Sequence, residues 1–100
     1  MLLSERLREL REKQELPQRK LAAALDIDTA TYCKFEKGIL RPKREHITIL
    51  SSLLCESEDE LLKLWLADKI TAVAETEKSV ATDALKLVNE SLNIDDNNAK

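Results

Sequence analysis

The side chains of this chain that could bind a charged partner gather in one short stretch. Five of its eleven residues are basic and one, Glu36, is acidic; the basic residues are Lys34, Lys37, Arg41, Lys43 and Arg44. Lysines and arginines clustered in this way can dock a polyanion, because the local field rather than the overall charge decides where it settles. The alternative is that they form an ordinary solvated surface.

The charges of the chain are divided unevenly between its two halves. The net charge of −3 by itself argues against a nucleic-acid partner. Residues 1–50, however, hold eleven Lys/Arg and eight Asp/Glu, a net charge of +3, whereas residues 51–100 hold five and eleven, a net charge of −6. The first half is therefore the part of the chain that could meet a polyanion.

No set of residues in the sequence has the composition of a catalytic centre. There is no Ser/His/Asp set, no glycine-rich phosphate loop and no cluster with metal-ligand spacing. His46 is the only histidine, and we expect it on the surface rather than as a ligand. We therefore predict that the chain is not an enzyme and uses neither a metal nor a cofactor.

Two short helices joined by a tight turn are predicted between Leu16 and Gly38. Leu21 and Leu25 lie four apart on the first helix, and Tyr32 and Phe35 lie three apart on the second. Gly38 ends the second helix, because glycine reaches the left-handed conformation without strain. The outward face of this second helix is polar and basic, which suits insertion into a DNA major groove; it is formed by Thr29, Ala30, Cys33, Lys34 and Lys37.

Residues 3 to about 64 resemble the phage-repressor/Cro-like helix-turn-helix family, also called XRE. The matching residues run in order without an insertion: Leu16, Gln18, Leu21, Ala22, Leu25, Ile27, Thr31, Phe35, Glu36, Gly38, Arg41 and Pro42. The resemblance implies an all-α fold, a lambda-repressor-like five-helix DNA-binding domain, to which this chain adds a C-terminal helix. It also implies double-stranded DNA as the partner and a homodimer on a two-fold site.

The outward face and the resemblance together predict which residues would meet DNA. Helix 28–37 would enter the major groove, and the residues facing base edges would be Asp28, Thr29, Ala30, Cys33 and Lys34. The residues contacting phosphates would be Gln18, Arg19, Thr31, Lys37, Arg41, Lys43 and Arg44. The family commonly pairs the positions of Arg11 and Glu36, which implies a structural ion pair here.

The turn departs from the family pattern at two acidic residues. Asp26 stands where glycine is usual, at a position that is usually left-handed, and aspartate tolerates this conformation better than most residues. Asp28 is expected to cap the helix that follows, with acceptance of a hydrogen bond from cytosine as the alternative role. Arg19, in the first turn of the preceding helix, would be favourable if a phosphate lies there, and tolerated surface variation is the alternative.

The chain is predicted to divide into residues 1–76, the helix-turn-helix domain, residues 77–93, a C-terminal helix for dimerisation, and residues 94–100, a disordered tail. Within the first part we expect helices at 4–14, with Ser4 as its cap, at about 43–54, and from the capping box at 57–60 onward. The last helix should cover about 79–92. The apolar residues expected at a dimer interface are Trp65, Leu66, Ile70, Val73, Val80, Ala84, Leu87 and Val88.

Two further features bear on location and on function. No apolar run of about 18 residues exists and the first residues do not form a signal peptide, so a cytoplasmic protein without a membrane span is expected. Cys33 and Cys55 should be reduced thiols, with Cys55 buried and inert.

The alternative to DNA binding is a protein–protein module on a helix-turn-helix scaffold, favoured by the acidic second half and its apolar residues.

Overall fold

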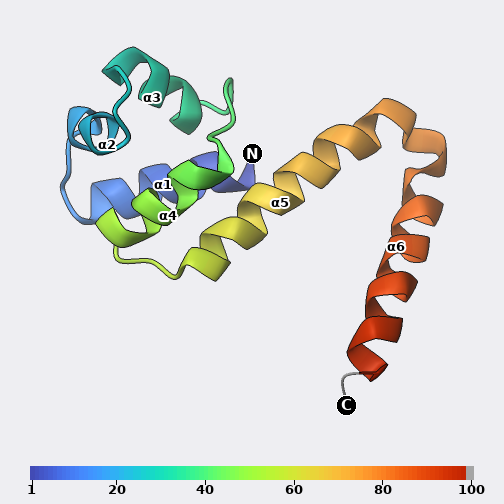
Figure 1. Cartoon of the computed structure of the whole chain (residues 1–100). Coiled ribbons are helices and arrows are strands. Elements are labelled where there is room, and N and C mark those ends of the chain that lie inside the picture. The colour runs from blue at the N-terminus through green and yellow to red at the C-terminus, as the bar shows by residue number, and fades with distance from the viewer. Residues whose placement is uncertain (99–100) are drawn as a thin grey trace. The chain divides into compact units, whose positions relative to one another are not determined.

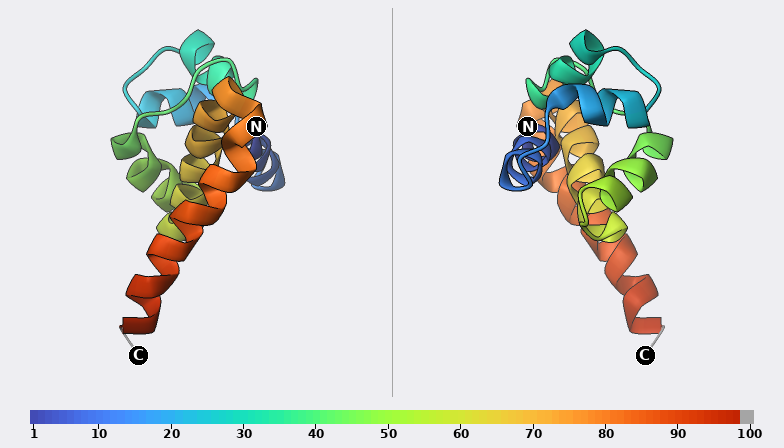
Figure 2. Two further views of the ribbon diagram at one scale, coloured as in Figure 1. Left: turned by 90° about the vertical axis from the view of Figure 1, so that its right-hand side faces the viewer. Right: turned by 90° about the vertical axis from the view of Figure 1, so that its left-hand side faces the viewer.

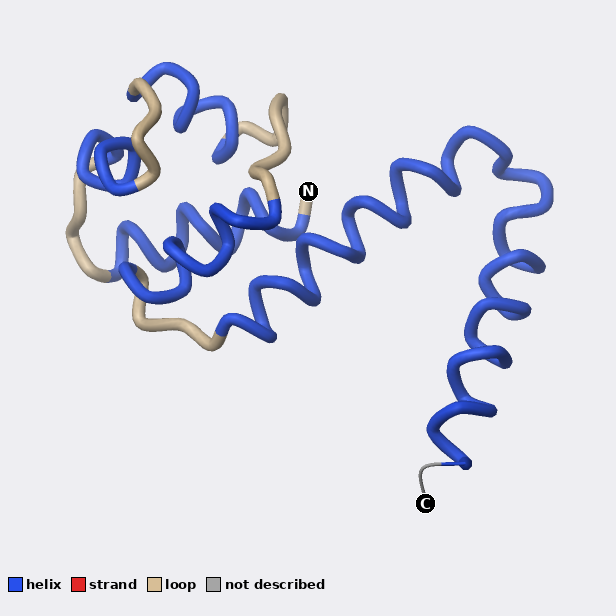
Figure 3. The backbone as a smooth tube through the Cα atoms, viewed as in Figure 1, coloured by secondary structure: helices blue, strands red, loops and turns tan. Residues whose placement is uncertain are grey.

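The computed structural model describes the backbone of residues 1–98 and the side chains of residues 1–93 (Figures 1 and 3). Its helices are α1 (Leu2–Lys13), α2 (Gln18–Ala24), α3 (Thr29–Glu36), α4 (Arg44–Leu53), α5 (Glu58–Ala74) and α6 (Lys78–Asn98), with a 3₁₀ turn, η1 (Glu75–Glu77), between the last two. No strand occurs among the described residues. The predicted all-α fold is confirmed.

The chain forms two compact units, unit 1 (Met1–Asp68) and unit 2, which begins at Lys69. In unit 1, α3 packs against both α2 and α1, and α2 also contacts α4. The two side views in Figure 2 show α2 and α3 next to each other. The predicted division of the chain at residue 76 stays a prediction.

The core of unit 1 is built from apolar side chains that recur at helical spacing. All five helices contribute, and the buried residues are Leu3, Leu7, Leu10, Leu21, Ala22, Leu25, Tyr32, Phe35, Ile47, Leu50, Leu54 and Leu61. Burying one leucine or phenylalanine fully stabilises a fold by about 1.5–3 kcal/mol. This core holds α3 by its apolar face and leaves its polar face outside.

The first four helices all end in the same left-handed cap. The residue after each C-cap has a positive φ, and the N–H that follows it bonds back to the last turn of the helix. Glycine occupies this position only after α3, where Gly38 has φ of 74°. Asp26 has φ of 58°, which confirms the left-handed turn expected there, and Glu15 and Cys55 have φ of 56° and 55°.

The prediction that Cys55 is buried is wrong, because its thiol is exposed. Cysteine is among the most buried residue types on average, but this cap position directs its side chain outward. The left-handed conformation costs a residue with a Cβ roughly 1–2 kcal/mol. Glycine avoids this cost but loses more backbone entropy on folding, so only part of the cost is recovered. Cys55→Gly should therefore stabilise unit 1 by about 0.5–1 kcal/mol in urea unfolding.

Cys55→Ala is the matched control for this prediction. It removes the same thiol but keeps the Cβ, and so should give no comparable gain. Equal stability of the glycine and alanine variants would show that backbone strain at this position is not what limits unit 1.

Helix α1 begins earlier than expected, and Ser4 does not cap it. The helix starts at Leu2, and the Ser4 hydroxyl lies inside its first turn, donating to the carbonyl oxygen of Met1 at 3.0 Å. The first N–H groups instead donate hydrogen bonds to the carboxylate of Asp68, far along the chain on α5. A cap of this kind leaves no local pattern in the sequence.

Unit 2 contains the end of α5, the turn η1 and α6. Helix α6 starts one residue earlier than predicted and continues to Asn98, so its predicted end near residue 92 is too early. Of the predicted tail 94–100, residues 94–98 have helical backbone, and residues 99–100 lie outside the described residues. No helix in the described part of the chain combines the length and apolar character needed to span a membrane.

Candidate nucleic-acid interface

Helix α3 begins at the cap that the sequence predicts. The Asp28 carboxylate accepts a hydrogen bond from the backbone N–H of Thr31 at 2.7 Å. Hydrogen bonds from the Thr31 side chain and backbone lower the pKa of Asp28. The carboxylate therefore stays ionised at neutral pH, where its charge complements the positive end of the helix dipole.

The two faces of α3 have opposite character. Tyr32, Phe35 and Glu36 are buried, and the rings of Tyr32 and Phe35 meet edge to face with centroids 5.9 Å apart. On the other face, the residues predicted to meet base edges are exposed at Asp28, Thr29, Ala30 and Lys34, and half-buried at Cys33. The helix is therefore anchored on one side and open to a partner on the other.

A buried ion pair attaches α3 to α1 and confirms the pairing that the resemblance implies. Arg11 donates from Nε to one oxygen of Glu36 at 2.7 Å and from Nη2 to the other at 3.0 Å. The Arg11 Nη1 also donates to the carbonyl oxygen of Leu16 at 2.9 Å, at the start of the helix-turn-helix. Gln18 adds a hydrogen bond from Nε2 to Glu36 at 3.1 Å. Three helices thus meet at one carboxylate.

The electrostatics of this pair keep both partners charged. Burial raises the pKa of Glu36, but hydrogen bonds from Arg11 and Gln18 and the neighbouring Tyr32 more than offset this, and the net shift is downward. The hydrogen bond from Arg11 to Glu36 raises the pKa of Arg11, against the effect of burial. The Tyr32 hydroxyl has no hydrogen bond of normal geometry among the described residues, yet lies close enough to help hold the charge of Glu36. Burial and Glu36 both raise the pKa of Tyr32.

The loop between α3 and α4, residues 37–43, carries the basic residues that follow the helix. The N–H groups of Ile39 and Leu40 bond to the carbonyl oxygen of Lys34, at 3.0 and 3.3 Å. At its end the Lys43 N–H donates to Nδ1 of His46 at 3.2 Å. The loop is therefore ordered by bonds to both of the helices it joins.

The structure places the predicted phosphate-contacting residues at two levels of exposure. Arg19, Lys37, Lys43 and Arg44 are exposed, and the remaining three, Gln18, Thr31 and Arg41, are half-buried. The exposed four come from α2, the end of α3, the loop and the start of α4. Their contacts with DNA stay a prediction.

The comparison with protein families decides what kind of domain this is. A family model described as a helix-turn-helix domain matches residues 2–64, more than half of the chain. The chain belongs to the helix-turn-helix domain family. The predicted resemblance to XRE-like proteins is confirmed, and domains of this family are typical of DNA-binding regulators. No curated protein and no solved structure gives a significant match.

Sequence reasoning missed three residues that position parts of this helix-turn-helix domain. His46 was expected on the surface, but it is half-buried, with its ring 5.8 Å from that of Phe35, and it caps α4. Trp65, expected at a dimer interface, packs partly buried against the core, and its Nε1 donates to the carbonyl oxygen of Pro42 at 2.8 Å. Asp68 caps α1. Only for Trp65, a large aromatic near apolar neighbours, did the sequence give any signal of burial.

The helix-turn-helix domain offers no arrangement for metal chemistry in the part of the chain that the structure describes. No group of three or more His, Cys, Asp or Glu side chains there is placed to hold a metal ion. Its outward face carries polar and basic side chains. The candidate functional site is therefore the exposed face of α3 together with the basic loop after it.

Proposed function

We propose that this chain is a sequence-specific DNA-binding transcriptional regulator, repressor-like or operon-controller-like, that inserts α3 into the major groove of DNA. One observation carries the proposal: α3 is locked to α1 and α2 through Glu36 while its opposite face stays exposed. A rigid helix with a polar outer face is what direct readout of base edges needs.

The proposed contacts divide between bases and phosphates. Lys34 would donate to guanine, and Ala30 and the methyl group of Thr29 would pack on thymine methyl groups. The basic residues of α2, the loop and α4 would hold phosphates and set the register of the helix in the groove. The outer face lacks arginine, asparagine and glutamine, so DNA shape would contribute to the choice of site.

Selection of bound sequences from a random duplex library tests this proposal. The wild-type chain should enrich a short motif, and Lys34→Ala should change the preferred base at one position of each half-site, since a good base contact is worth about 1–3 kcal/mol. Lys63→Ala is the control, because Lys63 is exposed on α5 and pairs with Glu60. A library that stays random with the wild-type chain would contradict sequence-specific binding.

We further propose that the regulator acts as a homodimer assembled through unit 2 and the exposed residue Leu66. The apolar side chains that support this are solvent-exposed in the single chain: Leu66, Ile70, Val73, Val80, Leu87 and Val88, with Ala84 beside them. Identical apolar patches close most simply around a two-fold axis. The α3 helices of the two protomers would then meet successive major grooves about 34 Å apart.

Sedimentation of the full chain at micromolar concentration should give a species of about twice 11.4 kDa. Leu87→Glu should convert it to a monomer, because Leu87 is 65% exposed and a charge there would be buried in the interface. Ser79→Glu, at an exposed position on the polar side of α6, should leave the dimer intact. A wild-type monomer at 11.4 kDa would remove the dimer from the proposal.

The second candidate function is a protein–protein module on the same scaffold. The exposed apolar side chains of unit 2 and the acidic second half of the chain favour it. Binding of random-sequence duplex DNA at low salt separates the two candidates. If DNA is the partner, the basic loop should bind such a duplex. Absence of that binding would favour the protein–protein module.

A further inference from the structure

Helix α5 contacts two other segments of unit 1 through polar side chains one turn apart. The indole Nε1 of Trp65 donates to the carbonyl oxygen of Pro42, at the end of the α3–α4 loop. The carboxylate of Asp68, a residue only 6% exposed, accepts from the N–H groups of Leu2 at 3.0 Å and Leu3 at 2.9 Å. Helix α5 thus holds the basic loop and the first turn of α1 at the same time.

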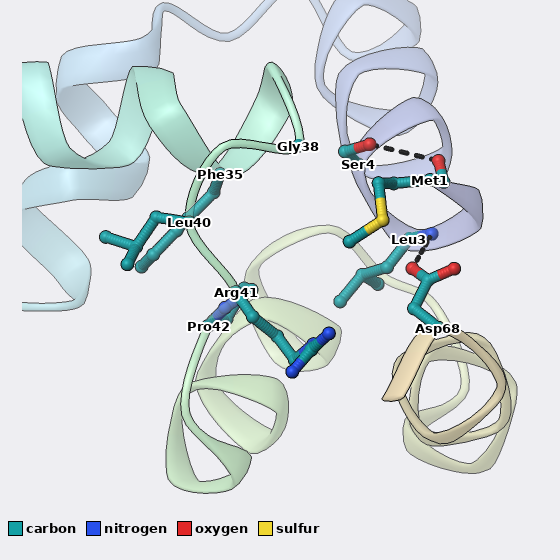
Figure 4. Close-up of a pocket in the computed structure, with 9 residues that line it drawn as sticks. All are labelled: Met1, Leu3, Ser4, Phe35, Gly38, Leu40, Arg41, Pro42 and Asp68. Atoms are coloured by element: carbon teal, nitrogen blue, oxygen red, sulfur yellow. Dashed lines mark hydrogen bonds between the residues drawn. The ribbon is translucent and has the colours of Figure 1, made fainter. Parts of the chain in front are cut away.

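The loop also touches the start of α1 directly. A Cβ built on Gly38 would lie 2.9 Å from Cγ of Met1, so only glycine fits there without movement, and the φ of +74° makes the same demand. Phe35, Gly38, Leu40, Arg41 and Pro42 line a small pocket together with Met1, Leu3, Ser4 and Asp68 (Figure 4). We call this meeting point of α1, α5 and the loop the junction.

Arg41 brings a positive charge into the junction. Figure 4 shows its side chain extending from the loop on the side of Leu3 and Asp68. Its Nε–H is buried and has no hydrogen-bond partner among the described residues. Burying a charged donor is costly unless an opposite charge lies near, and the Asp68 carboxylate lines the same pocket. Arg41 and Asp68 therefore belong to the same junction, Arg41 from the loop and Asp68 from α5.

We propose that Asp68 and Trp65 are positioning residues for DNA binding. They would set the loop from α5, so that its basic side chains meet the phosphates in a fixed geometry rather than after an ordering step. Ordering a side chain on binding costs affinity, and presetting it removes that cost. The inference rests on the proposed function, but its structural half, the holding of the loop, can be measured without DNA.

Asp68→Asn tests the proposal because positioning and overall charge predict opposite changes in DNA affinity. Removing an acid makes the chain less negative, which by charge alone should tighten binding to a random-sequence DNA duplex. Positioning predicts the reverse, a weakening of about tenfold. The control is Asp59→Asn, which removes the same charge from the exposed first turn of α5, outside the junction. Trp65→Phe keeps an aromatic ring, removes the donor to Pro42, and should weaken binding without any change of charge.

A double-mutant comparison and amide hydrogen exchange complete the test. In an Arg41→Ala background the loss caused by Asp68→Asn should shrink, because part of that loss acts through Arg41. Without DNA, the amides of Ile39 and Leu40 should exchange faster in Asp68→Asn than in Asp59→Asn, because their loop is released. If Asp68→Asn does not fold, Trp65→Phe is judged by the same two readouts.

Three results would overturn the proposal. The first is binding by Asp68→Asn as tight as that of Asp59→Asn. The second is weaker binding with unchanged exchange of the loop amides, and the third is an undiminished loss in the Arg41→Ala background. If the wild-type chain binds no duplex at all, the proposed function fails. Amide exchange alone then decides whether α5 holds the loop. Unchanged exchange of the loop amides in Asp68→Asn would overturn this structural claim as well.

Discussion

Binding of this helix-turn-helix domain to duplex DNA should weaken by about 10³–10⁵ when the salt concentration rises from about 50 to 200 mM. Each phosphate neutralised by lysine or arginine releases condensed counterions, and salt opposes that release. The range holds if a dimer neutralises about six to ten phosphates. Five of the seven residues proposed to contact phosphates in each chain are lysine or arginine, and four of these five are exposed in the free protein. Filter binding or fluorescence anisotropy over a salt series measures the slope.

Single substitutions should then lower the salt slope in steps. Lys43→Ala removes one phosphate contact from each protomer, so the slope of log affinity against log salt should fall by about 2 in a dimer. Affinity should drop alike on all sequences, because phosphates carry no base information. Lys63→Ala, whose ammonium pairs with Glu60 on α5, should leave the slope unchanged. Binding that does not respond to salt would shift the proposal to the protein–protein module.

Parts of the fold with a local cause could be predicted from the sequence. Asp28 was identified as a cap because a carboxylate before a helical stripe has one nearby set of N–H groups to accept from, and the structure shows that bond. The left-handed conformations of Asp26 and Gly38 follow from turn chemistry within a few residues. The pairing of Arg11 with Glu36 came from the family resemblance, not from spacing, since 25 residues separate them.

Contacts between residues far apart in sequence were beyond local reasoning. Asp68 lies 65 residues from Leu3, and nothing in the pattern of either helix indicates that one caps the other. Trp65 was assigned to a dimer interface because α5 carries apolar residues on several sides, yet its indole meets the loop at Pro42. Cys55 was misplaced because average burial of a residue type says nothing about a cap position. The predicted interface residues of unit 2 stay a prediction.

The largest expected effect on stability belongs to Glu36, where α1, α2 and α3 meet. Glu36→Ala should lower the free energy of unfolding by about 3–5 kcal/mol, because it leaves the Arg11 guanidinium in a largely buried site without its anion. The Gln18 amide loses its acceptor at the same time. Glu12→Ala, an exposed acid on α1, is the control and should stay within about 0.5 kcal/mol of wild type. Urea unfolding at neutral pH measures both.

The difference in free energy of unfolding between wild type and Glu36→Ala should depend on pH. This dependence distinguishes loss of the ion pair from simple loss of packing. The pKa of Glu36 is lowered in the folded state, so its charge stabilises the fold above the ordinary glutamate pKa of about 4.3, and that stability is lost as the pH falls through the lowered value. The gap between wild type and Glu36→Ala should therefore be full at pH 7 and narrow in acid, where Glu36 is protonated in the wild type too. A gap of constant size from pH 7 into acid would mean that the side chain acts by filling space. A gap no larger than that of Glu12→Ala at pH 7 would mean that Arg11 finds another partner when Glu36 is gone.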